Sequence, residues 1–320
     1  FTRTKHDSDF LVNAIEYCLK QAKIEHKDVD LVCFYDNPLL KFERILETYL
    51  GFVPKGIQSA WKALPIWIKD KLWISDLIQK QLGTDVQVIY PEHHESHAAS
   101  AFYPSPFESA AVLTIDGVGE WATTTIGYGK DHTIKIIKEL HFPHSVGLLY
   151  SAFTQYTGFR VNSGEYKLMG LAPYGNPNSQ QTKNYKEKIL SEMVDIREDG
   201  SVLLNMKYFK YATGLKMTAD KKWTNLFGIP PRNAESEISQ EYMNMALAIQ
   251  QITEEIVLKL AKTAKELTNS DYLVMAGGVA LNCVANGQLL KAQIFDNLYI
   301  QPASGDAGGS LGAALITPLV

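Results

Sequence analysis

Apolar and polar positions along the chain follow two periods, and together they predict a mixed α/β protein. The longest periodic segment is 237–268, where apolar residues recur with helical spacing along one stripe. Further helices are predicted at 10–24, 74–82, 96–103, 146–156, 180–193, 279–291 and 307–316. Short apolar runs predict strands at 29–35, 86–90, 272–275 and 297–301.

Three strands in a row, at 109–116, 121–128 and 133–142, are joined by short turns and predict an antiparallel meander. The Asp-Gly pair at 199–200 predicts a hairpin within 196–204. The glycine-punctuated, mostly uncharged segment 162–175 is expected to be a loop held against another surface, and 205–235 an irregular insertion. Segment 37–72 is interpreted as a helical excursion from the sheet, with Trp61, Trp67 and Trp73 spaced for core packing.

The order of elements in 1–108 matches the order in 109–320, except that the three opening strands of 109–320 have no counterpart in 1–108. This match predicts a duplicated α/β unit. This order resembles the paired ribonuclease-H-like domains of the actin, sugar-kinase and Hsp70 superfamily, whose ligands lie in a central cleft. We therefore predict a first, incomplete subdomain at 1–108, which contains the excursion, and a second at 109–320, with an insertion at about 176–235.

Composition narrows the class of protein. Of 320 residues, 46% are apolar and 21% charged, which is typical of a globular protein, and the net charge of −4 argues against a surface that coats nucleic acid. No apolar run approaches the length that spans a membrane. Cys18, Cys33 and Cys283 are few and odd in number, which favours a reducing cytoplasm over a disulfide framework.

The candidate chemistry begins at a strand-to-helix junction that contains His93 and His97. If the helix opens near Glu92, the two imidazoles lie at positions i and i+4 of one face and can hold one metal ion. Asp306 follows the last strand of the second unit and would face them across the cleft. Two histidines and one carboxylate suit Fe(II), with Zn(II) or Mn(II) as competitors. The plainer interpretations are a polar helix start for the histidines and a helix cap for Asp306.

Two glycine turns are candidates for nucleotide binding. Asp116-Gly-Val-Gly119 follows a strand and could place backbone N–H groups against phosphates, although most Asp-Gly turns are only turns. The segment 276–282 leads from a strand into a helix amino terminus, where anions are favoured, or else marks a close strand–helix crossing. Lys167 could compensate charge or be a solvated side chain. The predicted nucleotide-binding residues are Asp116, Gly117, Gly119, Lys167, Gly277, Gly278, Val279 and Asn282.

Other catalytic motifs are absent. The zincin motif needs Glu directly after its first His and a second His three residues later, and neither His93 nor His94 begins that pattern. The chain has no Gly-x-Ser-x-Gly elbow and no Walker-type phosphate loop.

Five motifs together resemble the NodU/CmcH-type O-carbamoyltransferases over nearly the whole chain. They are His93-His-Glu-Ser-His-Ala-Ala-Ser-Ala-Phe102, Asp116-Gly-Val-Gly-Glu120, Gly164-Glu-Tyr-Lys-Leu-Met-Gly-Leu-Ala-Pro-Tyr-Gly175, Gly277-Gly-Val-Ala-Leu-Asn282 and Gly305-Asp-Ala-Gly-Gly-Ser-Leu-Gly-Ala-Ala314. The threonylcarbamoyl transferases of tRNA modification and the HypF proteins contain a similar domain.

The resemblance implies an enzyme that uses ATP to convert carbamoyl phosphate to carbamoyl-adenylate and passes the carbamoyl group to a hydroxyl of a small molecule. It implies a divalent metal, most often iron, at His93, His97 and Asp306, and the nucleotide at 277–282 and 116–119. It also implies that 1–7 would lie inside a longer chain, after opening strands, and that a YrdC-like domain would follow Val320. Such a truncated chain is expected to be inactive alone.

Two other functions compete with this one. A small-molecule kinase of the same superfold would need only Mg²⁺ held largely by water and phosphates, and would give the histidine pair no purpose. The other is a non-catalytic nucleotide-binding module. The acceptor and the general base are not predicted.

Overall fold

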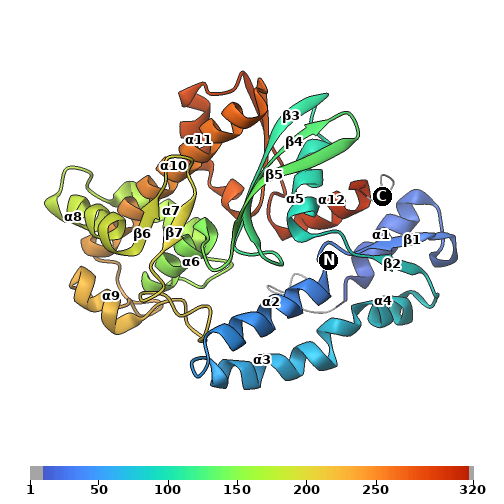
Figure 1. Ribbon diagram of the computed structural model, residues 1–320, viewed down its shortest axis with the longest axis horizontal. Coiled ribbons are helices and arrows are strands. Elements are labelled where there is room, and N and C mark those ends of the chain that lie inside the picture. The colour runs from blue at the N-terminus through green and yellow to red at the C-terminus, as the bar shows by residue number, and fades with distance from the viewer. Residues whose placement is uncertain (1–9, 317–320) are drawn as a thin grey trace.

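The computed structural model describes residues 10–316 and has a mixed α/β architecture (Figure 1). Its main sheet has five strands in the order β5-β4-β3-β8-β9. Their bounds are β3 Ser109–Ile115, β4 Ala122–Lys130, β5 Thr133–His141, β8 Tyr272–Ala276 and β9 Asn297–Ile300. The first three strands pair antiparallel, which confirms the predicted meander, while β8 is parallel to β3 and β9 is parallel to β8.

A second sheet consists of two parallel strands, β1 (Leu31–Cys33) and β2 (Gln87–Ile89). Helix α1 (Val12–Ala22) precedes β1. Between β1 and β2 the chain makes three helices, α2 (Pro38–Gly51), α3 (Ile57–Lys69) and α4 (Ile74–Leu82), which lie apart from the main sheet (Figure 1). The helical character predicted for 37–72 and the helix predicted at 74–82 are therefore confirmed. The predicted packing of the tryptophans is wrong for Trp61 and Trp73, which are 78% and 56% exposed.

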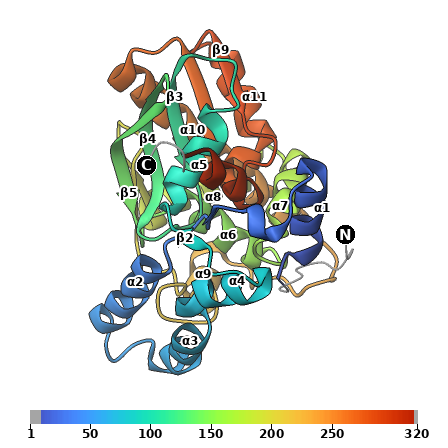
Figure 2. The same ribbon diagram turned by 90° about the vertical axis from the view of Figure 1, so that its right-hand side faces the viewer.

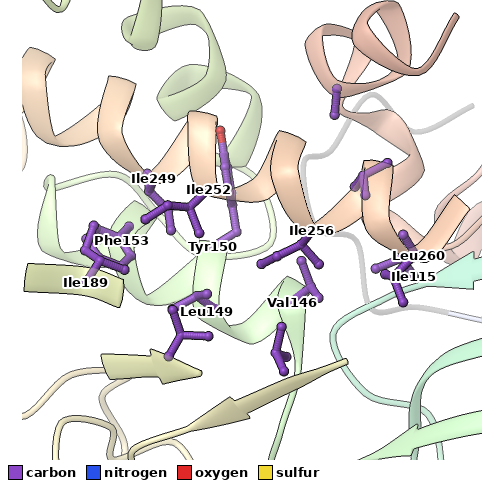
Figure 3. Packing of buried hydrophobic residues seen from close by; sticks show 14 of the residues in the cluster. Ile115, Val146, Leu149, Tyr150, Phe153, Ile189, Ile249, Ile252, Ile256 and Leu260 are labelled. Carbon is purple, nitrogen blue, oxygen red and sulfur yellow. The ribbon is translucent and has the colours of Figure 1, made fainter. Parts of the chain in front are cut away.

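Helices cover both faces of the main sheet. On one face, α6 (Val146–Tyr156) and the 29-residue α10 (Gln240–Thr268) enclose the larger core, where Phe153 packs near Ile249 and Ile252 (Figure 3). Because side chains alternate along a strand, Ile115 points into this core while Val112 points to the other face. There α5 (His93–Phe102) packs small residues such as Ala98 on the sheet, and α12 (Gly309–Ile316) lies beside α5 (Figure 2).

Several predicted elements need correction. Segment 162–175 is not a loop, because α7 (Glu165–Leu171) and a 3₁₀ turn (Ala172–Tyr174) occupy it, with Leu168 and Leu171 buried at helical spacing. Insertion 205–235 contains α9 (Asp220–Phe227), which the fully buried Trp223 anchors.

The remaining boundaries differ by a turn or less. The helix expected at 180–193 is α8 (Gln180–Lys188) followed by a π-helical turn, and the helix expected at 279–291 is a 3₁₀ turn (Gly278–Leu281) followed by α11 (Cys283–Ala292). Strands β6 (Val194–Ile196) and β7 (Val202–Leu204) form the predicted hairpin. Segment 1–7 of the family resemblance lies outside the described residues. Within residues 10–316 no helix is both long and apolar enough to cross a bilayer.

Candidate metal centre

The helix that carries the histidines begins at His93, three residues before the predicted span 96–103 and at the opening near Glu92 on which the pairing of the imidazoles depended. Glu92 is its N-cap, and Glu92 and Glu95 form a reciprocal capping box that fixes His93 as the first helical residue. His93 and His97 then lie one turn apart on the same face, with side chains only 2% and 1% exposed. Their Nε2 atoms are 3.0 Å apart, so both imidazoles point at one place.

Two carboxylates, Asp116 after β3 and Asp306 after β9, converge on the same place. Asp116 Oδ2 lies 3.0 Å from His93 Nε2 and 3.8 Å from His97 Nε2. Asp306 Oδ1 lies 3.6 Å from each of these nitrogens. One donor atom from each of the four residues lies within 4.8 Å of the others. Asp306 is the exposed member, at 61%, so the group opens to solvent on that side.

The predicted ligand set is therefore brought together, and Asp116 joins it. Asp306 is not a helix cap, since Gly305 is the N-cap of the turn (Asp306–Gly308) and no side-chain capping bond is made. Sequence reasoning placed Asp116 in a phosphate loop. Its position at the end of β3, facing the start of α5, aims the carboxylate at the imidazoles instead.

The pKa values of His93 and Asp116 are shifted by their contact with each other. Burial alone would lower the pKa of His93, but hydrogen bonds to Asp116 and Asp36 raise it to about 10. Burial would raise the pKa of Asp116, whereas hydrogen bonds with His93 and His97 hold it well below the usual range. Without a cation, the carboxylates can be balanced only by protons on the imidazoles.

The donor set fits a divalent transition metal. Ligands at about 2.1 Å from one ion stand roughly 3 Å apart when adjacent and roughly 4.2 Å apart when opposite. The 3.0 Å between the two imidazole nitrogens matches the distance between adjacent ligands. The four donor atoms lie within 4.8 Å of one another, so they would need to move only slightly closer to reach the distance between opposite ligands. Two histidines and two carboxylates suit Fe(II), Zn(II) or Mn(II).

Two residues that sequence reasoning missed hold His93 in place. Asp36, 7% exposed, accepts from His93 Nδ1 at 2.7 Å and is paired with Lys41 Nζ at 2.6 Å. When a metal ion takes the place of the Nε2 proton, this bond would fix the tautomer whose Nε2 lone pair faces the other ligands. Glu120 accepts from the backbone N–H groups of His93 and Asn37, at 3.0 and 2.7 Å. The available signal for Asp36 was its place directly after the predicted strand 29–35, whereas Glu120 lies in the turn between β3 and β4.

His94, the third histidine of the motif, points elsewhere. Its Nδ1 lies 2.6 Å from Thr114 Oγ1, which in turn contacts Thr125 Oγ1. Burial and the neighbouring His93 lower the pKa of His94 to about 3, so it is a neutral side chain. His94 is thus a buried structural residue beside the candidate metal group.

The predicted nucleotide loop is tied to this group. Gly278 N–H donates to Asp116 Oδ1 at 2.9 Å. Gly277 has a φ of +92°, and a Cβ there would lie 2.4 Å from the Ile115 carbonyl oxygen, so only glycine fits. At Gly119 a Cβ would lie 2.9 Å from His93 Cβ, whereas Gly117 is less confined.

A pocket of about 160 Å³ adjoins this loop. Gly278 and Asn282 line it on one side, and Glu165, Tyr166 and Met169 of α7 line it on the other, so two of the sequence motifs meet there. Not every predicted residue faces it.

Two of the predicted nucleotide residues, Val279 and Lys167, do not line the pocket, and the side chain of Asn282, which does line it, already has protein partners. The Asn282 side chain caps α11 and pairs with Gln250, and Val279 packs on the core. Lys167 lies exposed on α7 and is not among the residues that line the pocket. Binding of a nucleotide by these three residues stays a prediction.

The chain is similar to several known proteins. It is 53% identical over 323 residues to the uncharacterized protein sll1178 of Synechocystis sp., covering 98% of this chain and 51% of that protein. It is 30% identical over 318 residues to the nodulation protein NolNO of Sinorhizobium fredii, covering 98% of this chain and 42% of that protein. The chain thus spans about half the length of the curated relatives it matches.

Among solved structures, HypF of T. kodakarensis aligns with 76% of this chain and 38% of its own at a TM-score of 0.40 and 12% identity, a likeness too weak to define the fold. The family model described as the carbamoyltransferase N-terminus matches residues 1–315. This match confirms the resemblance found in the five motifs. The chain belongs to the carbamoyltransferase N-terminal family.

Proposed function

We propose that this chain is the metal- and nucleotide-holding part of an ATP-dependent O-carbamoyltransferase, which moves a carbamoyl group from carbamoyl phosphate, through carbamoyl-adenylate, to a hydroxyl of a small molecule. The observation that carries the proposal is the four-ligand group of His93, His97, Asp116 and Asp306, tied to a glycine loop by the Gly278–Asp116 hydrogen bond. Family membership adds the reaction class.

The architecture we propose is a pair of ribonuclease-H-like halves, 1–108 and 109–320, that face a central cleft. The two parallel strand pairs, β1–β2 and β8–β9, support this division. A helix follows each pair, and the histidines and Asp306 lie near the starts of these helices. The two helices, α5 and α12, pack against each other.

In the transfer step, the acceptor oxygen attacks the carbamoyl carbon, the bond from that carbon to the phosphate oxygen breaks, and AMP leaves with the electron pair. The hydroxyl proton passes to a base that we do not assign. A bound divalent ion, Fe(II) in the first place, would stabilise the negative charge that develops on the carbamoyl and phosphate oxygens. The hydrogen bond from Gly278 N–H to Asp116 Oδ1 would couple the nucleotide loop to the metal group, while Asp36 keeps His93 oriented.

The test combines metal analysis with turnover. Protein loaded anaerobically with Fe(II) is expected to contain about one ion per chain and to be stabilised against heat by ATP. ATP consumption by the full-length relative that contains this domain is expected to need carbamoyl phosphate. Consumption with a hydroxyl acceptor alone would establish the kinase alternative, and failure of ATP to stabilise the chain would contradict the nucleotide site.

Asp36→Asn is expected to weaken Fe(II) binding by about 10- to 100-fold, because the amide is a poorer partner for His93 Nδ1–H. Competition with a chelator of known affinity measures the change. Asp30→Asn, which changes an exposed carboxylate before β1, is the control and should bind Fe(II) like the wild type. Equal affinities for all three proteins would show that Asp36 does not position His93.

A further inference from the structure

A second pocket lies where the helical excursion meets the insertion. It measures about 160 Å³ and is lined by Arg44, Thr48 and Tyr49 of α2, by Tyr211 of the insertion and by Phe142. The excursion and the insertion also bond directly, since Ser59 Oγ donates to the Thr213 carbonyl at 2.9 Å. Residues of the excursion and of the insertion therefore line one shared pocket.

Arg44 is half-buried and brings to this pocket a guanidinium without a direct ion pair among residues 10–316. Its Nε is buried and has no hydrogen-bond partner, and no carboxylate of residues 10–316 lies within ion-pair distance of its guanidinium. The nearest candidates are already used. Glu120 accepts from two backbone N–H groups, and the two oxygens of Asp36 bind His93 and Lys41. Burial lowers the pKa of Arg44, and Glu120 and Asp36 oppose this only through space. A buried Nε without a direct partner therefore favours a bound anion.

The rest of the pocket is aromatic and apolar. The Arg44 guanidinium lies 5.0 Å from the centroid of the Phe142 ring, and Phe142 meets Tyr211 edge-on at 6.0 Å. Tyr211 is fixed in turn by a 2.5 Å hydrogen bond to the Pro143 carbonyl. A cavity of about 150 Å³ accommodates a molecule the size of benzene. The site thus suits a single ring that carries an oxyanion.

The pocket also adjoins the proposed reaction site. Val118, which lines it, lies between Gly117 and Gly119 and only two residues after Asp116. Glu120, at the end of the same turn, ties α2 to the start of α5 through Asn37 and His93. One side of this turn therefore faces the candidate metal group, and the other side faces the pocket.

We propose that this pocket binds the acceptor of the carbamoyl group, and that the acceptor carries a carboxylate or phosphate that Arg44 receives as a bidentate partner. This inference rests on the proposed function. Guanidinium groups match both oxyanions in geometry and charge. The aromatic walls would cover the apolar body of the acceptor and leave its hydroxyl toward the turn that contains Asp116.

Calorimetric titration with 4-hydroxyphenylacetate, phenyl phosphate and neutral 4-hydroxyphenylacetamide tests the proposal. At least one of the two ring oxyanions is expected to bind about tenfold or more tightly than the amide, and Arg44→Gln should abolish this preference. Arg197→Gln, which changes an exposed arginine paired with Asp195, should keep it. A preference for carboxylate over phosphate, or the reverse, identifies the anionic group. Binding of inorganic phosphate as tight as that of both ring compounds would overturn the acceptor assignment.

Thermal unfolding and metal content of the same samples separate the alternatives. If Arg44 were only a structural cation for Glu120 and Asp36, Arg44→Gln would unfold at a lower temperature and wild type would bind the three ring probes equally, which overturns the proposal. We expect instead an unchanged or higher unfolding temperature. If Arg44→Gln loses the preference for the ring oxyanions but keeps its Fe(II), the change is confined to this pocket and supports the proposal. If the wild type holds no Fe(II), the proposed function is refuted.

Discussion

His97→Gln is expected to lower the affinity for Fe(II) by about 100-fold or more. Removing a residue that only orients a ligand costs about 10- to 100-fold, so removing a ligand itself should cost at least the upper value. Glutamine has a similar volume but cannot place a nitrogen lone pair where His97 Nε2 now meets His93, Asp116 and Asp306. Metal content after gel filtration and chelator competition measure the loss.

The chain offers a matched control on the same helix. His94 is as buried as His97, at 3% against 1% exposure, but faces Thr114 rather than the carboxylates. His94→Gln should therefore disturb packing to a similar degree while keeping Fe(II) affinity within about threefold of the wild type. Equal loss of metal in both variants would mean that burial of the motif, and not ligation by His97, accounts for the effect.

The start of α5 could be predicted because its determinants are local. Glu92 and Glu95 are three residues apart and cap the helix, and the spacing of His93 and His97 then follows from helical geometry. The approach of Asp306 was predicted from the repeated order of elements, and the contacts of 3.6 Å agree with it.

Other parts of the site depend on tertiary contacts that leave no local signal. Whether Asp116 faces a phosphate or an imidazole depends on how close the turn at Gly119 lies to α5. Asp36 becomes a partner of His93 only because β1 and β2 pair and align their ends. Helix α7, which buries Leu168 and Leu171, was missed because glycines at 164, 170 and 175 masked the spacing of these two residues.

The site also depends on a very close crossing of two helices. A Cβ on Gly312 of α12 would lie 1.7 Å from the Ser96 carbonyl oxygen of α5, a distance that no side chain can occupy. This crossing holds α12 against the histidine helix and, through the turn that precedes α12, sets the position of Asp306. Packing and ligand geometry are therefore coupled at one residue.

Gly312→Ala is accordingly expected to destabilise the protein by about 3 kcal/mol, near the upper end for overpacking, since backbone and not a flexible side chain must move. Because α12 must shift away from α5, Fe(II) affinity should fall as well. Denaturant unfolding without metal measures the first effect, and chelator competition on folded protein measures the second.

Gly287→Ala in α11 is the control for the backbone effect of replacing glycine in a helix. Nothing lies within 4 Å of the position of its Cβ, so alanine should stabilise by about 0.5–1 kcal/mol and leave Fe(II) binding unchanged. Wild-type stability in Gly312→Ala would contradict the close crossing. A destabilised Gly312→Ala that binds Fe(II) as the wild type does would keep the crossing but separate it from the position of Asp306, and the ligand group would then depend on the turn at Gly305 alone.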